Sequence, residues 1–484
     1  MTLPNNKTKI VATIGPASDS PEMLEKLIRA GLNVARLNFS HGEFSDHADR
    51  IARIRAAEQA TGCSVTIMAD LPGPKMRVGI IEPKLVHLAP GDAFTLTSED
   101  IVGNAQRASM SFEPLPRVVT PGDKLYLNDG LIQLMVESVT GNDVHCTVAA
   151  GGELSSRKGL NLPGIDLGIN AFTDHDHACL EFALNNGVDS VSQSFVESAA
   201  DIEAVRAAAD ALGKKPFIIA KIERVEAIDH LDEILHAADG IMVARGDLGV
   251  EVPIEQIAVI QKRVIAMANR AGKPVITATQ MLESMTISRL PTRAEATDVA
   301  NAILDGTDCI MLSGESAMGN YPEEAVSMLA RIAASAEAHR DATAKDPAQQ
   351  QSLVAPTTKD EAISDIVHHS IRSVPCSAVF APTQTGTTPR MISRFKPHVW
   401  IIAGCRDIRV SKGLAFSYGV RAIHLQDGTI DWQEFAKNWL SENNLPVHLA
   451  ILVAGPSPKK PSANYRVEFL RFITESPETL LPSN

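Results

Sequence analysis

The sequence lacks the cysteine spacing that marks zinc sites and disulfide frameworks. Its six cysteines are scattered through 484 residues without a Cys-x-x-Cys pair. An apolar run long enough to span a bilayer is also missing, and the first nine residues, MTLPNNKTK, contain no apolar core like that of a signal peptide. We therefore expect a cytoplasmic protein that has no membrane partner.

An excess of basic residues is missing as well. The 45 Lys and Arg residues stand against 58 Asp and Glu residues, which gives a net charge of -13. This balance argues against non-specific binding of nucleic acid. An anionic ligand must then be held by a local cluster of basic side chains or by bound cations. A hydrophobic share of 44% in a chain of this length is enough for two or three domains with buried cores.

Short β-rich runs alternate with amphipathic helical patterns along most of the chain. This alternation is typical of parallel strands joined by helices, and eight such units predict a closed (β/α)8 TIM barrel. The predicted strands are residues 9–14, 33–39, 65–70, 190–195, 217–222, 240–245, 274–279 and 309–314.

One unit of the predicted barrel is interrupted after its third strand. About ninety residues of alternating pattern, broken by Gly-Asp and Asn-Asp turns, separate that strand from its helix, which is far more than an ordinary loop. We expect a small inserted β-barrel lid domain at 72–159, and the barrel itself at 1–71 and 160–342. After a polar linker, a second alternation predicts a C-terminal open α/β sheet domain at 355–476.

Polar residues gather at the ends of the predicted strands, where the active site of a barrel enzyme lies. Lys221 and Glu223 are two residues apart and face the same side of a strand, and Asp247 follows the next strand on a glycine-flanked turn. Two carboxylates with waters suit Mg²⁺, and a structural Lys–Glu pair is the alternative. The full set is Arg36, Asn38, Ser40, Asp70, Lys221, Glu223, Asp247, Thr279, Ser313 and Glu315.

Six stretches carry a specific pattern: TKIVATIGPAS, NVARLNFSHG, AKIE, IMVARGDLGVE, GKPVITATQMLESM and PTRAEATDVANAILDGTDCIMLSGESAMGNYPEEAV. Together they closely resemble the pyruvate kinase family. The resemblance covers the barrel, the lid and, more loosely, the C-terminal domain. It implies transfer of the phosphoryl group of phosphoenolpyruvate to ADP, giving ATP and pyruvate, by a homotetramer.

The resemblance also implies roles for the strand-end residues. Glu223 and Asp247 would bind Mg²⁺ or Mn²⁺, and Lys221 would stabilise the transferred phosphoryl group and the enolate. Thr279 and the backbone of Gly246 would contact the substrate carboxylate. Thr279 would also join a proton relay with Ser313 and Glu315. The matches to phosphate-binding and nucleotide-binding residues are Arg36, Arg77, Asn38, Ser40, His41 and, in the lid, Lys158.

The stretch after the third strand departs from the family pattern. Most relatives read Asp-Thr-Lys-Gly-Pro-Glu there, and they hold K⁺ with the residues that match Asn38, Ser40, Asp70 and the carbonyl of Leu71. Here the stretch reads DLPGPK, so Lys75 replaces the family's glutamate. An ammonium group is a compact monovalent cation on a flexible stem. We expect that Lys75 takes the place of K⁺ and that K⁺ is not required; an ordinary Pro-Gly-Pro surface turn is the alternative.

Three further details differ from the family or suggest another site. Glu197 stands where the family usually has Arg or Lys, and the lid turn reads LNDG, which leaves one acid, Asp129. The run DHDH at 174–177 could suggest a metal site. We interpret it as a helix start, where acids complement the helix dipole.

The stretch APTQTGTTPRMISRFKP resembles the effector loop of regulated family members. In such a loop, hydroxyls and backbone N–H groups at a helix start hold a sugar phosphate or a nucleotide. A Thr-rich helix cap without a ligand is the alternative. The other half of the site, a glycine-rich loop in relatives, here reads GPSPKKPSANYR. The candidate effector residues are Thr383, Thr385, Gly386, Thr387 and Thr388.

Two other functions compete with phosphoryl transfer. A Mg²⁺-dependent barrel enzyme that makes or breaks a C–C bond through a pyruvate enolate would share the metal pair. It would have no use for a lid carrying Lys158 or for a nucleotide loop at 38–41. An inactive sugar-phosphate sensor would share the fold, but the intact Lys221, Glu223 and Asp247 argue against it.

Overall fold

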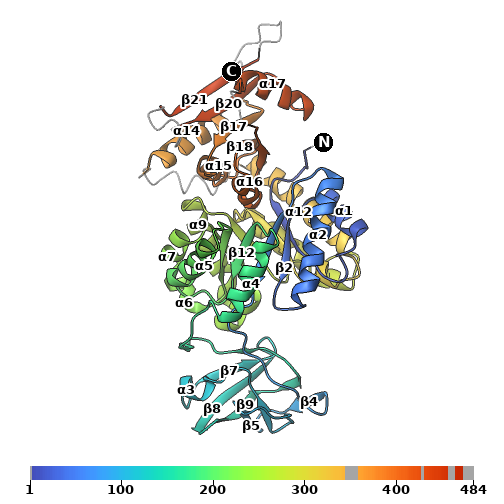
Figure 1. The fold of residues 1–484 in the computed structure, drawn as a ribbon, viewed down its shortest axis with the longest axis vertical. Coiled ribbons are helices and arrows are strands. Elements are labelled where there is room, and N and C mark those ends of the chain that lie inside the picture. The colour runs from blue at the N-terminus through green and yellow to red at the C-terminus, as the bar shows by residue number, and fades with distance from the viewer. Residues whose placement is uncertain (1–2, 344–357, 427–429, 456–463, 473–484) are drawn as a thin grey trace.

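The computed structural model describes residues 3–343, 358–426, 430–455 and 464–472. Three bodies follow one another along the long axis of the molecule, with the barrel in the middle, the inserted domain at one end and the C-terminal domain at the other (Figure 1). Most of the predicted linker, residues 344–357, lies outside the described residues. No helix of the described segments is long and apolar enough to cross a membrane.

Eight parallel strands close into the barrel in the order β1-β16-β15-β14-β13-β12-β3-β2. Both faces of each strand are covered, which is why the strands are almost uninterrupted apolar runs. The fold class expected from the sequence is confirmed. The strands are β1 (Lys9–Thr13), β2 (Leu32–Asn38), β3 (Thr66–Leu71), β12 (Ser190–Gln193), β13 (Phe217–Ile222), β14 (Gly240–Ala244), β15 (Val275–Ala278) and β16 (Cys309–Leu312).

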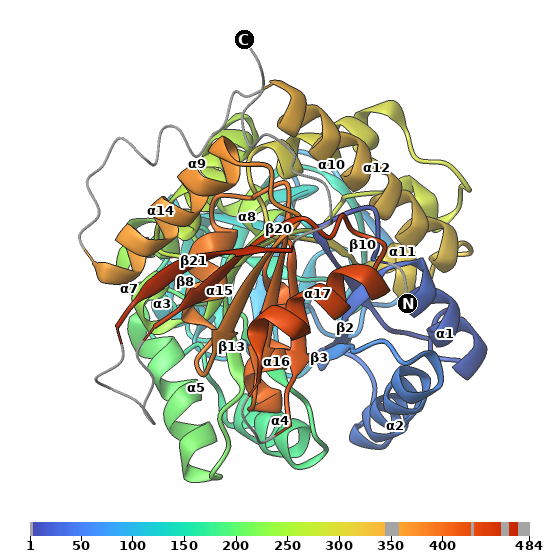
Figure 2. The ribbon, with the colours of Figure 1, turned by 90° about the horizontal axis from the view of Figure 1, so that it is seen from above.

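Helices surround the barrel, as the view along its axis shows (Figure 2). Local sequence sets their ends: α1 starts where the Ser20 side chain accepts from Met23 N, and it stops at Gly31, whose φ of 119° favours glycine. The helices are α1 (Pro21–Ala30), α2 (Phe44–Thr61), α4 (Asp174–Asn185), α5 (Ala199–Ala211), α6 (Val225–Asp229), α7 (Leu231–Ala237), α8 (Arg245–Glu251), α9 (Ile257–Arg270), α10 (Arg293–Leu304), α11 (Gly314–Ala317) and α12 (Pro322–Thr343), with short 3₁₀ turns η1 (Ile254–Gln256) and η2 (Glu283–Thr286).

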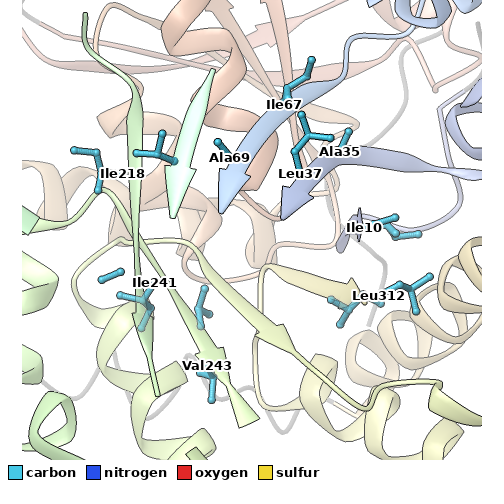
Figure 3. Packing of buried hydrophobic residues seen from close by; sticks show 14 of the residues in the cluster. Ile10, Ala35, Leu37, Ile67, Ala69, Ile218, Ile241, Val243 and Leu312 are labelled. Carbon is cyan, nitrogen blue, oxygen red and sulfur yellow. The ribbon is translucent and has the colours of Figure 1, made fainter. Parts of the chain in front are cut away.

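The barrel has two apolar layers. Outward-facing strand residues such as Ile10, Leu37 and Val243 form one layer with the surrounding helices (Figure 3). Inward-facing residues such as Met68 and Ile276 fill the barrel interior, and Phe416 of the C-terminal domain belongs to the same cluster. The barrel interior is therefore filled by apolar side chains, and the polar side chains of the candidate site lie at the strand ends.

The inserted domain is built almost wholly of strands. A curled six-stranded sheet has the order β11-β7-β8-β9-β5-β6, and β10 pairs with β4 in a separate two-stranded sheet. Its elements are β4 (Leu85–Leu88), β5 (Ala93–Thr97), β6 (Arg107–Ser109), α3 (Leu115–Val118), β7 (Lys124–Leu127), β8 (Ile132–Thr140), β9 (Asp143–Ala150), β10 (Gly152–Ser155) and β11 (Leu160–Asn161).

The C-terminal domain is a mixed five-stranded sheet in the order β19-β18-β17-β20-β21, in which only the edge strand β21 runs antiparallel. Its elements are α14 (Lys359–Ser373), β17 (Ala378–Thr383), α15 (Thr387–Ser393), β18 (Trp400–Cys405), α16 (Ile408–Gly413), η3 (Leu414–Phe416), β19 (Val420–His424), α17 (Trp432–Glu442), β20 (Leu449–Ala454) and β21 (Arg466–Arg471).

The C-terminal domain closes the end of the barrel opposite the inserted domain. The ring of Phe416 stacks on Phe217 with centroids 5.2 Å apart, and its carbonyl accepts from Cys309 Sγ. Beside it, Lys396 Nζ lies 2.8 Å from Asp308 Oδ1, and both side chains are almost completely buried. Because a buried charge is costly unless it is paired, this ion pair fixes how the two domains meet.

Candidate active site

Arg36 and Asp70 form the centre of the strand-end cluster. Arg36 Nε donates to Asp70 Oδ2 at 3.1 Å, and Arg36 Nη1 donates to Thr13 Oγ1 at 2.8 Å. Ser192 Oγ donates to Asp70 Oδ1 at 2.6 Å. Burial alone would raise the pKa of Asp70, but Lys221, Arg36 and Ser192 together hold that pKa below its ordinary value. Asp70 is therefore an ionised carboxylate committed to its neighbours.

Lys221 links this centre to Glu223. Its Nζ donates to Ser194 Oγ at 2.6 Å and lies 3.1 Å from Glu223 Oε2 and 3.7 Å from Asp70 Oδ1. Burial would lower the pKa of Lys221, but Asp70, Glu223 and Asp247 raise it above its ordinary value. The neighbouring carboxylates therefore favour the charged form of Lys221, and its contact with Glu223 agrees with the two side chains facing the same side of the strand.

Glu223 and Asp247 have the chemistry of a divalent-cation site. Glu223 Oε1 accepts from Phe195 N at 2.7 Å, whereas Oε2 accepts no hydrogen bond of ordinary geometry from the described residues. Burial raises the pKa of Glu223 to about 7, which Lys221 opposes and Asp247 reinforces. Asp247 has solvent-accessible surface at the mouth of the site, but the protein packed around its carboxylate limits hydration and raises its pKa, which Lys221 opposes and Asp129 and Asp70 reinforce.

A cation of charge +2 between these two carboxylates would relieve that repulsion, so the residues fit Mg²⁺ or Mn²⁺. No group of three or more His, Cys, Asp and Glu side chains suited to a metal occurs in the described segments. Two protein carboxylates are nevertheless typical of Mg²⁺, which keeps several waters and binds substrate oxygens.

Thr279 lies on strained backbone next to this pair. Its φ is 68°, and that of Gln280 is 53°, a left-handed conformation that non-glycine residues rarely adopt outside functional sites. Its hydroxyl accepts from Gly246 N at 2.8 Å and donates to the Ala278 carbonyl at 2.6 Å. Arg245 Nη2 donates to the Thr279 carbonyl at 2.7 Å and so supports the strained turn.

Ser313 and Glu315 have different partners from Thr279. Glu315 is fully buried, and its carboxylate accepts from Leu282 N at 3.1 Å and from Ser313 N at 2.8 Å. No hydrogen bond joins Thr279 to either residue in the part of the chain that the structure describes. In this arrangement Glu315 supports the turns that follow β15 and β16, and a proton relay between the three residues stays a prediction.

Lys75 points its ammonium group at the loop after β2. Its Nζ donates to the Ser40 carbonyl at 2.9 Å, and Ser40 N donates to Asn38 Oδ1 at 3.0 Å. Ser194 Oγ donates to the Leu71 carbonyl at 2.7 Å. Burial lowers the pKa of Lys75 to about 8, with Arg77 lowering it further and Asp70 opposing the change. Of the four residues matched to the K⁺ ligands of relatives, Ser40 therefore contacts the ammonium group directly and Asp70 acts on its charge.

The Pro-Gly-Pro turn that carries Lys75 is tightly packed. Gly73 has a φ of 65°, and a Cβ there would lie 2.8 Å from Phe195 Cδ2, so only glycine fits. Gly73 N donates to Asp176 Oδ1 at 2.8 Å. Asp176 is also half of the capping box of α4 with Thr173, so the run at 174–177 does start a helix. Sequence reasoning missed the second contact of Asp176, because nothing local indicates it.

The predicted nucleotide residues lie around the lid side of the cluster. Burial lowers the pKa of His41, and the nearby charges of Lys75, Arg77 and Arg36 lower it further. Arg77 Nη1 donates to the Arg157 carbonyl at 3.3 Å, which draws Arg77 to the turn that carries Lys158. The ammonium group of Lys158 has no hydrogen bond or ion pair with any described residue, and it is left available at the lid surface.

The predicted effector turn is well ordered by its own side chains. Gly386 N donates to Thr383 Oγ1 at 2.8 Å, the hydroxyls of Thr385 and Thr387 are 2.9 Å apart, and Arg390 donates to the Thr385 carbonyl at 2.9 Å. The other half of the predicted site, residues 456–463, lies outside the described residues.

Two profiles of one protein family match the chain, the pyruvate kinase barrel domain over residues 5–326 and the pyruvate kinase alpha/beta domain over residues 361–464. A pyruvate kinase of Thermococcus litoralis is 50% identical over 422 residues, which cover 87% of this chain and 89% of that protein. A pyruvate kinase of Geobacillus stearothermophilus is 44% identical over 422 residues, covering 86% of this chain and 71% of that protein. The crystal structure of a pyruvate kinase from Cryptosporidium parvum matches with a TM-score of 0.89 at 38% identity, and the match covers 96% of each chain.

The barrel with its inserted domain and its charged strand-end cluster defines a phosphotransferase of the TIM-barrel class. The chain belongs to the pyruvate kinase family. The activity predicted from the sequence motifs is thereby confirmed. It implies phosphoenolpyruvate and ADP as substrates and a divalent metal ion as cofactor.

Proposed function

We propose that phosphoryl transfer takes place at the strand-end cluster and that Lys221, Glu223 and Asp247 are its principal residues. The observation that supports this most strongly is the charge arrangement: the buried Lys221, whose pKa the neighbouring carboxylates raise, lies 3.1 Å from Glu223 Oε2, and this oxygen accepts no hydrogen bond of ordinary geometry from the described residues. Glu223 and Asp247 would hold Mg²⁺ or Mn²⁺, which when bound supplies positive charge for the carboxylate and enolate oxygens of the substrate. The site would work in the cytoplasm, where glycolysis supplies its substrates.

The chain's own residues would then divide the work of the transfer. Lys221 faces the phosphoryl group and the enolate, and it would stabilise the charge that develops on both. Arg36 would bind a phosphate oxygen through the N–H groups that remain, because Asp70 and Thr13 accept from only three of the five donors of its guanidinium group. Gly246 N and Thr279 would hold the substrate carboxylate at the strained turn. Such transfers need mostly positioning and charge stabilisation, which this cluster can provide.

The nucleotide would bind between the loop at 38–41 and the inserted domain. Asn38, Ser40 and His41 form the barrel side of this space, and Arg77 and Lys158 would come from the lid. Closure of the lid would bring the ammonium group of Lys158, which has no partner among the described residues, to the phosphates and would exclude water from the transfer.

The first test replaces Lys221 by Met. Because one preorganised cationic donor is lost, we expect kcat to fall by about 10²–10³. Pyruvate formation from phosphoenolpyruvate and ADP measures the rate, and circular dichroism checks that the variant is folded. Lys262→Met, which removes the ion pair of an exposed lysine with Asp305 outside the strand-end cluster, is the matched control and should keep normal turnover. A folded Lys221→Met enzyme with normal kcat would contradict the proposed role.

We further propose that Lys75 supplies the positive charge that K⁺ supplies in relatives. Its ammonium group donates to the Ser40 carbonyl. The Leu71 carbonyl accepts from Ser194, and Asp70 accepts from Arg36, so these two matched ligands already have partners within the protein. A tethered cation is present at every ion concentration and pays no entropy of capture from solution. It would also help to order Arg77, which is two residues further along the chain.

The test of this proposal compares buffers. Activity in tetramethylammonium buffer should equal activity with added K⁺, and Lys75→Glu should create a K⁺ requirement because it replaces the cation by a carboxylate. Lys84→Glu makes the same charge change at an exposed position of the inserted domain and should create no such requirement. Near inactivity of the unaltered enzyme without K⁺ would overturn the proposal.

We also propose that a sugar phosphate or a nucleoside monophosphate regulates the enzyme at the turn of Thr383, Thr385, Gly386, Thr387 and Thr388. The clustered hydroxyls and the guanidinium group of Arg390 behind the turn support binding of an anion.

In the effector experiment, hexose phosphates, pentose phosphates and nucleoside monophosphates are screened for a change in the apparent KM for phosphoenolpyruvate. Replacing Thr385 and Thr387 by Glu should abolish any response through like-charge repulsion, whereas replacing both by Ser keeps the hydroxyls and should preserve it. If the unaltered enzyme responds to none of these compounds, the turn is only a helix cap.

The family resemblance implied a homotetramer, and we propose this assembly on the basis of two separate apolar faces. On the C-terminal domain, Ile366 of α14 and Phe469 of the edge strand β21 are 54% and 47% exposed and border one shallow cavity. On the barrel, Ile254 and Val259 are 74% and 68% exposed. A tetramer with dihedral symmetry needs two different self-complementary faces, which these would provide to further copies of the chain.

Sedimentation velocity tests the assembly. The unaltered protein should sediment as a tetramer, and Ile366→Lys with Phe469→Lys should leave dimers, because four buried charges per interface would be unpaired. Ile408→Lys changes an exposed residue outside both faces and should leave the tetramer intact. A monomeric unaltered protein would refute the proposal.

A further inference from the structure

The guanidinium group of Arg224 is surrounded by carboxylates in the protein interior. The Arg224 side chain is 2% exposed, and it lies 3.5 Å from Glu197, 3.3 Å from Glu226 and 3.6 Å from Glu251. Its Nη2 donates to the Ile165 carbonyl at 3.0 Å. Sequence reasoning noted that Glu197 is unusual at its position but did not identify its partner.

This cluster depends on its single cation. Three carboxylates face one guanidinium group, and burial raises the pKa of Glu251 to about 7 and also raises the pKa of Glu197. An arginine does not lose its proton in proteins, so Arg224 remains a cation at any pH of interest. Without it, the three carboxylates would repel one another in a poorly solvated region and the segments that carry them would separate.

The segments joined by Arg224 are those that define the proposed metal site. Arg224 directly follows Glu223 along the chain. Glu251 lies at the end of α8, four residues after Asp247, so both side chains project from the same face of that helix. One guanidinium group therefore connects the turn that carries Glu223 with the helix that carries Asp247.

The same group also reaches the inserted domain. Ile165, whose carbonyl accepts from Arg224, belongs to the segment that returns from the inserted domain to the barrel. A displacement of that segment would therefore pull on the guanidinium group of Arg224 through this hydrogen bond. Arg224 is the next residue in the chain after Glu223, so the displacement would also reach Glu223.

We propose that Arg224 is a positioning residue that sets the spacing of Glu223 and Asp247 for the divalent cation and fastens the returning segment of the inserted domain to that site. This inference rests on the proposed metal site. It concerns residues that touch neither substrate nor metal, so its effect is expected on metal affinity before it appears in the rate.

The experiment measures binding of Mn²⁺ alone to the full-length enzyme, with free Mn²⁺ followed by electron paramagnetic resonance. Arg224→Met should weaken Mn²⁺ binding by about 10–100-fold, the usual effect of losing a group that orients metal ligands. Arg224→Lys keeps the charge without the fork of donors and should fall between. Arg206→Met removes another arginine ion pair of the same barrel, with Asp239, and should bind Mn²⁺ normally.

Moving the positive charge to another position of the cluster makes the test sharper. Because Glu197 Oε1 lies 3.5 Å from the guanidinium group, an arginine at position 197 can bring its own guanidinium group to Glu226 and Glu251. Arg224→Met combined with Glu197→Arg should therefore recover most of the lost Mn²⁺ affinity. The same recovery is expected in the Mg²⁺ concentration for half-maximal activity, with little change in the KM for ADP.

Glu223→Gln separates the possible failures. If Glu223→Gln leaves Mn²⁺ binding unchanged, the proposed metal site itself is wrong. If Glu223→Gln weakens binding while folded Arg224→Met or Arg224→Lys binds Mn²⁺ like the unaltered enzyme, the metal site stands and the role of Arg224 is overturned. A folded double variant that binds as weakly as Arg224→Met would also overturn it. If Arg224→Met does not fold, Arg224→Lys decides, and thermal unfolding of Arg206→Met shows the effect of a purely structural ion pair.

Discussion

The structure depends most on the pairing of the buried charges at the end of the barrel that faces the inserted domain. Asp70 lies between strands, 2% exposed, and it is kept ionised by Arg36, Ser192 and Lys221. Replacing Arg36 or Lys221 would leave part of the buried charge of Asp70 uncompensated, which costs far more than a surface pair contributes. The network therefore sets the rotamers of Arg36 and Lys221 before any ligand binds. This preorganisation is what charge-stabilising catalysis requires, because the groups do not have to reorganise during the transfer.

Much of this arrangement could be predicted from the sequence because it follows short periodicities. The eight strands are apolar runs of the right length, and Lys221 and Glu223 share a face because side chains of a strand alternate. The contacts that could not be predicted join segments far apart in the chain. Gly73 meets Asp176, and Arg224 meets Ile165 and Glu251, and no local pattern indicates such pairings. The boundaries of the three domains stay predictions for the same reason, since a boundary depends on contacts made across it.

The C-terminal domain contributes to the stability of the barrel through contacts that both domains share. Phe416 completes the interior packing of the barrel, and the carbonyl of Lys412 accepts from Thr66 Oγ1 at 2.8 Å at the start of β3. β3 ends at Asp70 and Leu71, so one strand connects the domain contact at one end to the charged centre at the other. Close packing transmits displacements with little loss, which gives a physical route by which an event in the C-terminal domain could reach the active site.

Both crossings between the barrel and the inserted domain are fastened beside the charged centre. On the way out, Gly73 is bonded to Asp176 and Lys75 to the loop at Ser40. On the way back, Ile165 is bonded to Arg224, next to Glu223. Both attachment points of the inserted domain are therefore hydrogen-bonded to residues beside the proposed metal and nucleotide sites. Binding of an anionic substrate would change the electrostatic field at these hydrogen bonds. Occupancy of the site and the position of the inserted domain would then depend on each other, because a ligand shifts an equilibrium toward the arrangement that it binds more tightly.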